Sequence, residues 1–229
     1  MGLFPFAMVL LAQAPAAQQW TFVTAQGELA KVRYAFEVHT RVGLSAQPVQ
    51  LTAVQLSPSL GVTLPGDVSL WAAYSRFEQL DGSRPDENRL WQQVLFDRDT
   101  DRLRFVMRAR VEQRFFVGLA SPAVRLRFLV RGSAPLPVKT VRLLAQNEVF
   151  LHALGAGDVV TGGFDQNRTQ ASLQWRPAPW VTLELGYMLQ VPRSLVLSHN
   201  VITSVTFRLP KWNPFEPPDD RDDLSLPQG

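Results

Sequence analysis

The chain contains no cysteine among its 229 residues, which excludes a disulfide framework, a thiol nucleophile and a thiolate metal site. Beyond the N-terminus there is no apolar run of about twenty residues, so the sequence offers no membrane-spanning helix. It also lacks a phosphate-binding glycine loop and the spacing of zinc ligands. These absences exclude several common classes of site. What remains informative is the alternation of polar and apolar residues.

The segment LRFVMRARVEQR, from Leu103 to Arg114, shows this alternation most clearly. Its odd positions are apolar from Leu103 to Val111, whereas its even positions carry arginine or glutamate except at Val106. A β-strand sends successive side chains to opposite faces, so this strand would have one oily and one densely charged face. Dense charge on an inner face is typical of a closed barrel with lipid outside and a polar lumen inside.

The same pattern recurs in five further segments of roughly ten residues, the length that a tilted membrane strand needs. These segments are 32–41, 124–131, 141–152, 166–175 and 181–190. Asn147 interrupts the oily side of one of them. We therefore predict an all-β fold, a single antiparallel up-and-down transmembrane β-barrel with an Arg/Glu-lined lumen. A soluble β-sandwich or lipocalin-like barrel is the alternative.

Turn and loop residues divide the chain into eleven candidate strands, and short turns alternate with longer connections. The strands are expected at 19–29, 32–41, 49–63, 68–78, 89–97, 103–115, 124–131, 141–152, 163–175, 181–190 and 200–208. A bacterial single-chain barrel is expected to have an even number of strands. We therefore predict 10–12 strands and favour twelve. The short turns would lie on the periplasmic side.

Three regions are expected along the chain. Residues 1–17 resemble a signal peptide, with an apolar run at 3–11 and small residues at 14–17 for cleavage. Residues 18–209 would form the outer-membrane barrel. Residues 210–229 contain the run EPPDDRDD and are predicted to be a flexible, acidic, proline-rich tail, with a docking or calcium-attracting role as the alternative.

Several short motifs stand out between residues 20 and 209, of which GFDQNR at 163–168 is the most specific. The others are Trp20, the run 102–112, VRLRF at 124–128, Asn147-Glu148-x-Phe150, LGYMLQ at 185–190 and HNV at 199–201. In these motifs the chain resembles a family of uncharacterised Gram-negative outer-membrane β-barrel proteins, classed as a domain of unknown function. The resemblance implies a barrel fold and a location in the outer membrane. It supplies no catalytic residues, because that family has no established activity.

The charged residues of the inner strand faces are the candidate lumen-lining residues. They are Arg33, Glu37, Arg104, Arg108, Arg110, Glu112, Arg125, Arg127, Arg131, Arg142, Glu148, Arg168 and Glu184. Arginine and glutamate can form forked pairs that fill and rigidify a narrow interior. Arginine outnumbers glutamate on these faces, so a narrow passage for small anionic solutes is the second interpretation.

No catalytic residue, cofactor or metal site is predicted. Ser198, His199 and Asn200 form the only close Ser/His/Asn cluster, and neighbouring Ser and His point to opposite faces of a strand. The turn with Asp97, Asp99 and Asp101 is expected to be solvated, because it lacks the glycine and terminal glutamate of a calcium loop.

We therefore expect a non-enzymatic outer-membrane barrel, either structural or an arginine-lined passage for small anions. An outer-membrane lipid hydrolase and a soluble periplasmic barrel that binds a small ligand are the alternatives. The expected partners are outer-membrane lipid and, during biogenesis, the barrel-assembly machinery and periplasmic chaperones. The net charge of +3 is modest and the arginines alternate with apolar residues, so nucleic acid is not expected. The oligomeric state is left open.

Overall fold

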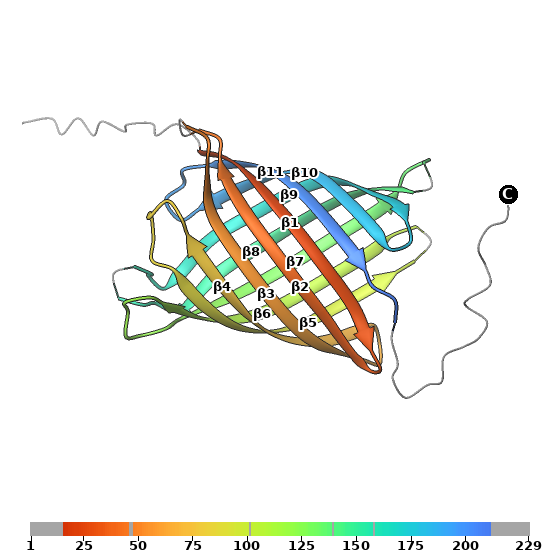
Figure 1. The fold of residues 1–229 in the computed structure, drawn as a ribbon, viewed down its shortest axis with the longest axis horizontal. Helices are drawn as coiled ribbons and strands as arrows, with labels where there is room; N and C mark the ends of the chain where they lie inside the picture. Colours follow the sequence, from red (N-terminus) through yellow and green to blue (C-terminus); the bar gives the residue numbers. More distant parts are fainter. Residues whose placement is uncertain (1–15, 46–47, 101, 139, 158, 212–229) are drawn as a thin grey trace, which may run out of the picture.

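The computed structural model describes residues 16–45, 48–100, 102–138, 140–157 and 159–211, and they form a barrel of eleven β-strands (Figure 1). The strands are β1 (Ala16–Leu29), β2 (Val32–Gly43), β3 (Gln50–Leu64), β4 (Val68–Gln79), β5 (Glu87–Asp99), β6 (Arg104–Phe116), β7 (Ala123–Pro135), β8 (Val141–Leu154), β9 (Gly163–Ala178), β10 (Val181–Pro192) and β11 (Ser198–Arg208). Within these ranges no helix is long and apolar enough to cross a membrane.

Each strand pairs antiparallel with its neighbours in sequence, and the sheet closes where β1 pairs with β11. That closing pair is parallel, with a continuous register from Ala16↔Ser198 to Gln26↔Arg208. An odd number of strands that alternate in direction leaves the first and last strand running the same way, so parallel closure is unavoidable. The predicted barrel is confirmed, but the preference for twelve strands and for purely antiparallel pairing was wrong. All eleven segments expected from the sequence are strands, and the even-number rule was the source of the error.

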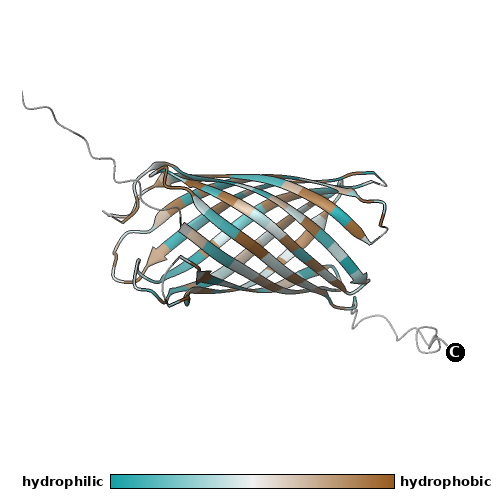
Figure 2. Ribbon diagram, turned by 90° about the horizontal axis from the view of Figure 1, so that it is seen from above, coloured by the Kyte–Doolittle hydropathy of each residue, from teal (hydrophilic) through white to brown (hydrophobic). Residues whose placement is uncertain are grey.

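The outer surface of the barrel is apolar around its whole circumference. Every strand contributes at least one exposed large hydrophobic side chain, among them Leu60 (61% exposed), Phe128 (48%) and Leu185 (61%). Polar and apolar residues alternate along the strands, as the hydropathy colouring of Figure 2 shows. The alternation in the sequence therefore corresponds to the apolar outer face and the polar inner face of the barrel wall.

Polar and charged side chains make up much of the buried interior, and two small apolar clusters lie among them. One cluster inside the barrel joins Trp20, Met188 and Ile202. A second, at the end of the barrel, joins Phe116 and Ala123 to the loop between β8 and β9. Much of the rest of the buried set is polar or charged. The usual arrangement of a water-soluble domain, apolar inside and polar outside, is thus inverted.

The connections at the two ends differ in length. Short turns join the strands at residues 30–31, 65–67, 100–103, 136–140 and 179–180, and we call this the turn end. The connections at residues 44–49, 80–86, 117–122, 155–162 and 193–197 have five to eight residues, against two to five at the turn end, and define the loop end. The predicted alternation of turns and loops is therefore present. Because the strand count is odd, β1 starts at the loop end and β11 finishes at the turn end.

The remaining predictions on chain organisation fall largely outside the described residues. The expected signal peptide, residues 1–17, reaches the described part only at Ala16 and Ala17, which open β1. Of the expected tail, 210–229, only Pro210 and Lys211 are described, and Lys211 Nζ lies 3.1 Å from Glu28 Oε1.

Candidate functional site: an arginine-rich interior

A cavity of about 930 Å³ lies in the barrel interior and is lined by residues from both ends. Asp81 and Arg84 border it in the loop between β4 and β5, at the loop end, and Thr140 and Arg208 border it at the turn end. The inward faces of strands all around the wall supply the rest of the lining. The lining residues therefore extend along the whole length of the barrel.

Positive charge dominates this cavity. Its lining contains fourteen arginines but only seven aspartate and glutamate residues. The arginines come chiefly from β5 to β9, whereas β10, β11 and β1 contribute mostly Ser, Thr and Gln. One arc of the wall is thus strongly charged, and the arc beside the parallel closure is nearly neutral.

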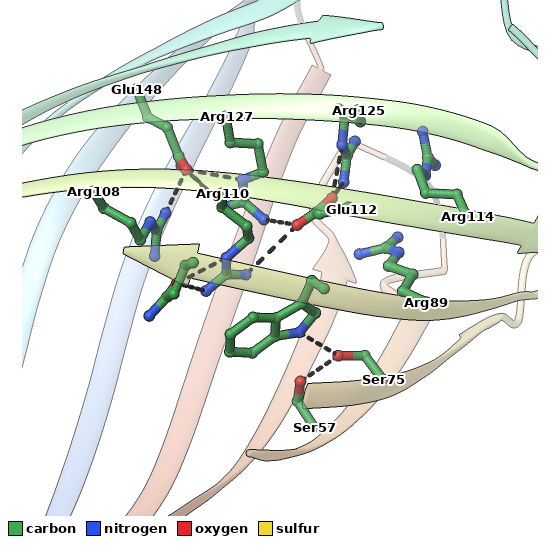
Figure 3. Close-up of polar contacts among 12 residues, drawn as sticks. Ser57, Ser75, Arg89, Arg108, Arg110, Glu112, Arg114, Arg125, Arg127 and Glu148 are labelled. Carbon is green, nitrogen blue, oxygen red and sulfur yellow. Dashed lines mark hydrogen bonds and ion pairs between the residues drawn. The ribbon is translucent and has the colours of Figure 1, made fainter. Parts of the chain in front are cut away.

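Glu112 on β6 is the centre of an ion-pair network on the charged arc (Figure 3). It is 1% exposed. Arg125 Nε donates to its Oε2 at 2.8 Å, and Arg127 Nη1 donates to its Oε1 at 2.6 Å. Arg110 Nη1 lies 3.5 Å from the same Oε1. Neighbouring strands in register bring these side chains together, since Glu112 pairs with Arg125 across β6 and β7.

Glu148 on β8 continues the network. Arg127 forks onto it, with Nε to Oε1 at 2.8 Å and Nη2 to Oε2 at 3.1 Å, and Arg108 also donates to its Oε1. At the loop end Glu87 accepts two hydrogen bonds from Arg114, at 2.7 and 3.0 Å, and one from Arg89. Paired guanidinium and carboxylate groups are the arrangement that buried charges require.

Other arginines are held by neutral groups or by the aspartates of the turn end. Arg104 forks onto Asp97. Arg131 donates to Gln146 Oε1 at 2.7 Å, and Arg142 Nη2 donates to the Ser133 carbonyl oxygen at 2.8 Å. Arg142 Nη2 also lies 3.6 Å from Asp99 Oδ1, so Arg104 and Arg142 are partly offset by aspartates, whereas Arg131 forms no ion pair with a described carboxylate.

Two further arginines form no ion pair with a described carboxylate and, unlike Arg131, donate no hydrogen bond to an oxygen among the described residues. Arg41 on β2 and Arg168 on β9 instead flank one indole, that of Trp20, at 4.0 and 4.7 Å from the ring centroid. Arg168 Nε is buried and has no hydrogen-bond partner among the described residues. Arg41 Nε has a long contact of 3.5 Å to His39 Nε2.

The structure places the predicted residues on the inner face. Eleven of the thirteen line the cavity: Glu37, Arg104, Arg108, Arg110, Arg125, Arg127, Arg131, Arg142, Glu148, Arg168 and Glu184. Glu112 does not line the cavity, but it forms ion pairs with Arg110, Arg125 and Arg127, which do. Arg33 is near the turn end, where its guanidinium lies 5.0 Å from the centroid of the Trp71 ring.

The sequence-based selection missed several residues that the structure adds. They are Trp20, Arg41, Glu87, Arg89 and Arg114. Glu87 was missed because the expected strand began at Arg89, two residues late. Arg41 and Arg114 share the parity of the predicted residues on their own strands, and that parity was the signal available in the sequence.

In the candidate cluster of Ser198, His199 and Asn200, the serine and histidine side chains lie on opposite faces of the wall. His199 faces outward and its Nδ1 lies 2.5 Å from Tyr187 Oη, whereas Ser198 lines the cavity. His152 Nε2 lies 3.0 Å from Arg114 Nη1. Among the described residues there is no group of three or more His, Cys, Asp or Glu that could hold a metal ion.

Comparison with curated proteins and with solved structures gives no match. One family model matches, over residues 17–194, which is most of the barrel. The chain therefore belongs to the family described as protein of unknown function (DUF2490).

Proposed function

We propose that this protein is a β-barrel of the bacterial outer membrane whose arginine-rich interior is a narrow, non-enzymatic passage for small anionic solutes. The observation that carries the proposal is the cavity lined from both ends, in which arginines outnumber carboxylates two to one. Unpaired positive charge along a pore favours anions.

The outer surface supports the location in a membrane. A continuous apolar surface on all eleven strands would be unfavourable in water and suits lipid. Trp175 (49% exposed) and Trp180 (58%) lie on the outside near the turn between β9 and β10, where an aromatic girdle would meet the headgroups. The same surface argues against a soluble periplasmic barrel. Outer-membrane lipid, the assembly machinery and periplasmic chaperones are then the proposed partners.

A structural barrel is the second candidate, favoured by the network around Glu112 and Glu148. Paired arginines bridge β6, β7 and β8 and stiffen that arc of the wall. A lipid hydrolase has less support, because His199 bonds Tyr187 on the outer face while Ser198 faces the cavity.

The passage is tested by the reversal potential of the purified protein in planar bilayers under a KCl gradient. We expect an anion-selective current. The double variant Arg131→Gln with Arg142→Gln removes two turn-end charges without stranding a buried carboxylate, so it should shift the reversal potential towards zero. Arg76→Gln is the matched control, because Arg76 pairs with Asp86 away from the cavity lining. Absence of current, or cation selectivity, would overturn the passage and favour the structural candidate.

A further inference from the structure

At the loop end of the cavity, arginine and aromatic side chains alternate across five strands. Arg168 (β9) and Arg41 (β2) flank Trp20 (β1), and Arg41 and Arg89 (β5) both lie over Phe77 (β4), at 5.1 and 4.6 Å from its centroid. We call these five residues the arginine–aromatic ladder. All five line the cavity.

The ladder carries more positive charge than the described carboxylates neutralise. Arg41 and Arg168 form no described ion pair, and Arg89 shares Glu87 with Arg114. Burial disfavours the charge of Arg41 most, and the like charges of Arg168, Arg89 and Arg125 add to this, with Glu87 acting in the opposite sense. Like charges held together in a confined interior are unfavourable unless a counter-ion is bound.

The geometry leaves hydrogen-bond donors of Arg41 and Arg168 available, whereas Arg89 already donates Nη1 to Gln55 and Nη2 to Glu87. A guanidinium that stacks on an aromatic ring uses its face, and its N–H groups lie in the plane at its edges. Arg168 Nε is buried without a partner, and so is Arg89 Nε. Buried donors are normally satisfied, so these two mark the place where an acceptor is absent.

We infer that the arginine–aromatic ladder is a binding site for a small tetrahedral oxyanion of the phosphate type. Such an ion offers several acceptor oxygens and a charge that guanidinium groups bind strongly. The closed wall separates the ladder from bilayer lipid, so the ligand is a free solute ion. The inference rests on the proposed function for the access of solute, but binding itself does not require passage through the turn end.

Binding is tested by titrating the detergent-solubilised full chain with inorganic phosphate in a calorimeter, with chloride as the reference anion. The wild type should bind phosphate in preference to chloride. Phosphate should also raise its thermal transition, because a ligand of the folded state stabilises it. Arg41→Gln and Arg168→Gln should each weaken binding by at least about tenfold, the effect expected for loss of a charged hydrogen-bond donor.

Two controls separate a site from general charge or from folding defects. Arg76→Gln removes one positive charge outside the cavity and should leave phosphate affinity unchanged. Without phosphate, Arg168→Gln should melt no lower than the wild type, because it relieves like-charge repulsion. Three results would overturn the inference. They are an equal loss of phosphate affinity in Arg76→Gln, no phosphate binding by the wild type, and a loss of thermal stability in Arg168→Gln without phosphate.

The outcome also separates this inference from the proposed passage. Phosphate binding without current would leave the ladder as a binding site and remove the passage. Anion current that is unchanged in Arg41→Gln and Arg168→Gln, with no phosphate binding, would remove the ladder site and leave the passage intact.

Discussion

Glu112 has more arginine partners than Glu148, and its position explains why the inner wall tolerates so much charge. Its two carboxylate oxygens contact Arg110, Arg125 and Arg127, which all point inward from β6 and β7. Without this carboxylate the three largely buried guanidinium groups would repel one another. A buried carboxylate shared by several arginines is therefore a structural requirement of the charged arc.

Replacing Glu112 by Gln should lower the free energy of unfolding by about 3 kcal/mol, since it leaves buried guanidinium groups without a counter-charge. Urea unfolding of the barrel in detergent micelles measures this. Glu78→Gln is the control. Glu78 is 49% exposed in its pair with Arg76, so it should change stability by no more than about 0.5 kcal/mol. Similar effects of the two substitutions would contradict the role given to Glu112.

Which face each arginine occupies could be predicted from the sequence, but which partner it meets could not. The period of two places Arg41 and Arg168 on the inner face as reliably as Arg125. Pairing depends on the register and on which strands are neighbours across the closure. Arg168 is in register with Glu148 on β8, but Glu148 accepts its hydrogen bonds from Arg108 and Arg127. Opposite Arg41 the neighbouring strands place Trp20 and Ala53, which supply no carboxylate.

At the scale of the strand, Gly61 shows how close packing inside the barrel constrains single positions. A Cβ atom at Gly61 would lie 2.5 Å from Cδ2 of Trp71, whose ring covers the glycine from β4. Trp71 is also the ring over which Arg33 lies. The glycine of β3 therefore makes room for an aromatic side chain on the adjacent strand, a device that pins strand register.

Gly61→Ala should destabilise the barrel by about 1–3 kcal/mol, because the Trp71 ring must move. Gly132→Ala on β7 is the matched control. A Cβ there meets nothing within 4 Å, and alanine is better tolerated than glycine inside a strand, so no loss is expected. Thermal unfolding in micelles compares the two. A Gly61→Ala variant as stable as Gly132→Ala would show that the indole does not pack as described.

The outer face makes a separate prediction for β7. Phe128 lies near the middle of this strand and is 48% exposed. Phe128→Arg places an arginine at this depth in a bilayer and should make the free energy of folding into the membrane less favourable by about 2–4 kcal/mol. Leu103→Arg, next to a turn, should cost no more than about 1 kcal/mol. Folding into lipid vesicles measures both, and equal effects would contradict a lipid-facing outer surface.

Not every position on the outer face could be anticipated from the alternation. Asn147 interrupts the oily pattern, and the structure shows why this is tolerated. Its side chain exchanges two hydrogen bonds of 3.0 Å with Asn167 on β9, and it also donates to Thr169 at 2.9 Å. The three polar side chains satisfy one another on the outer wall. Residues twenty positions apart become neighbours only through the β8–β9 register, which the sequence pattern does not reveal.

For the whole molecule, the parallel pairing of β1 with β11 is the feature that the sequence did not predict. Six strands were visible as alternating segments and turn residues divided the chain into eleven, yet a general rule of even strand number favoured twelve. Closure depends on the total number of strands and on the curvature of the complete sheet. No local pattern in β1 or β11 reports the direction of the strand that it will meet.

The seam can be tested by crosslinking, because the chain has no cysteine of its own. Thr21 and Thr203 are paired across it, and their Oγ1 atoms lie 2.9 Å apart. The variant with cysteine at both positions should form an intramolecular disulfide on oxidation, seen as altered mobility on a non-reducing gel. Cysteines at Thr21 and Val205 should crosslink poorly, since Val205 pairs with Val23. The reverse preference would rule out this closure.

The most direct test of the central claim is the gel mobility of the detergent-extracted outer-membrane fraction, compared with and without boiling. A closed barrel in that membrane should remain folded in detergent, so the account predicts that the unboiled protein is present there and migrates faster. Recovery in the soluble fraction, with no difference in mobility on boiling, would contradict the account.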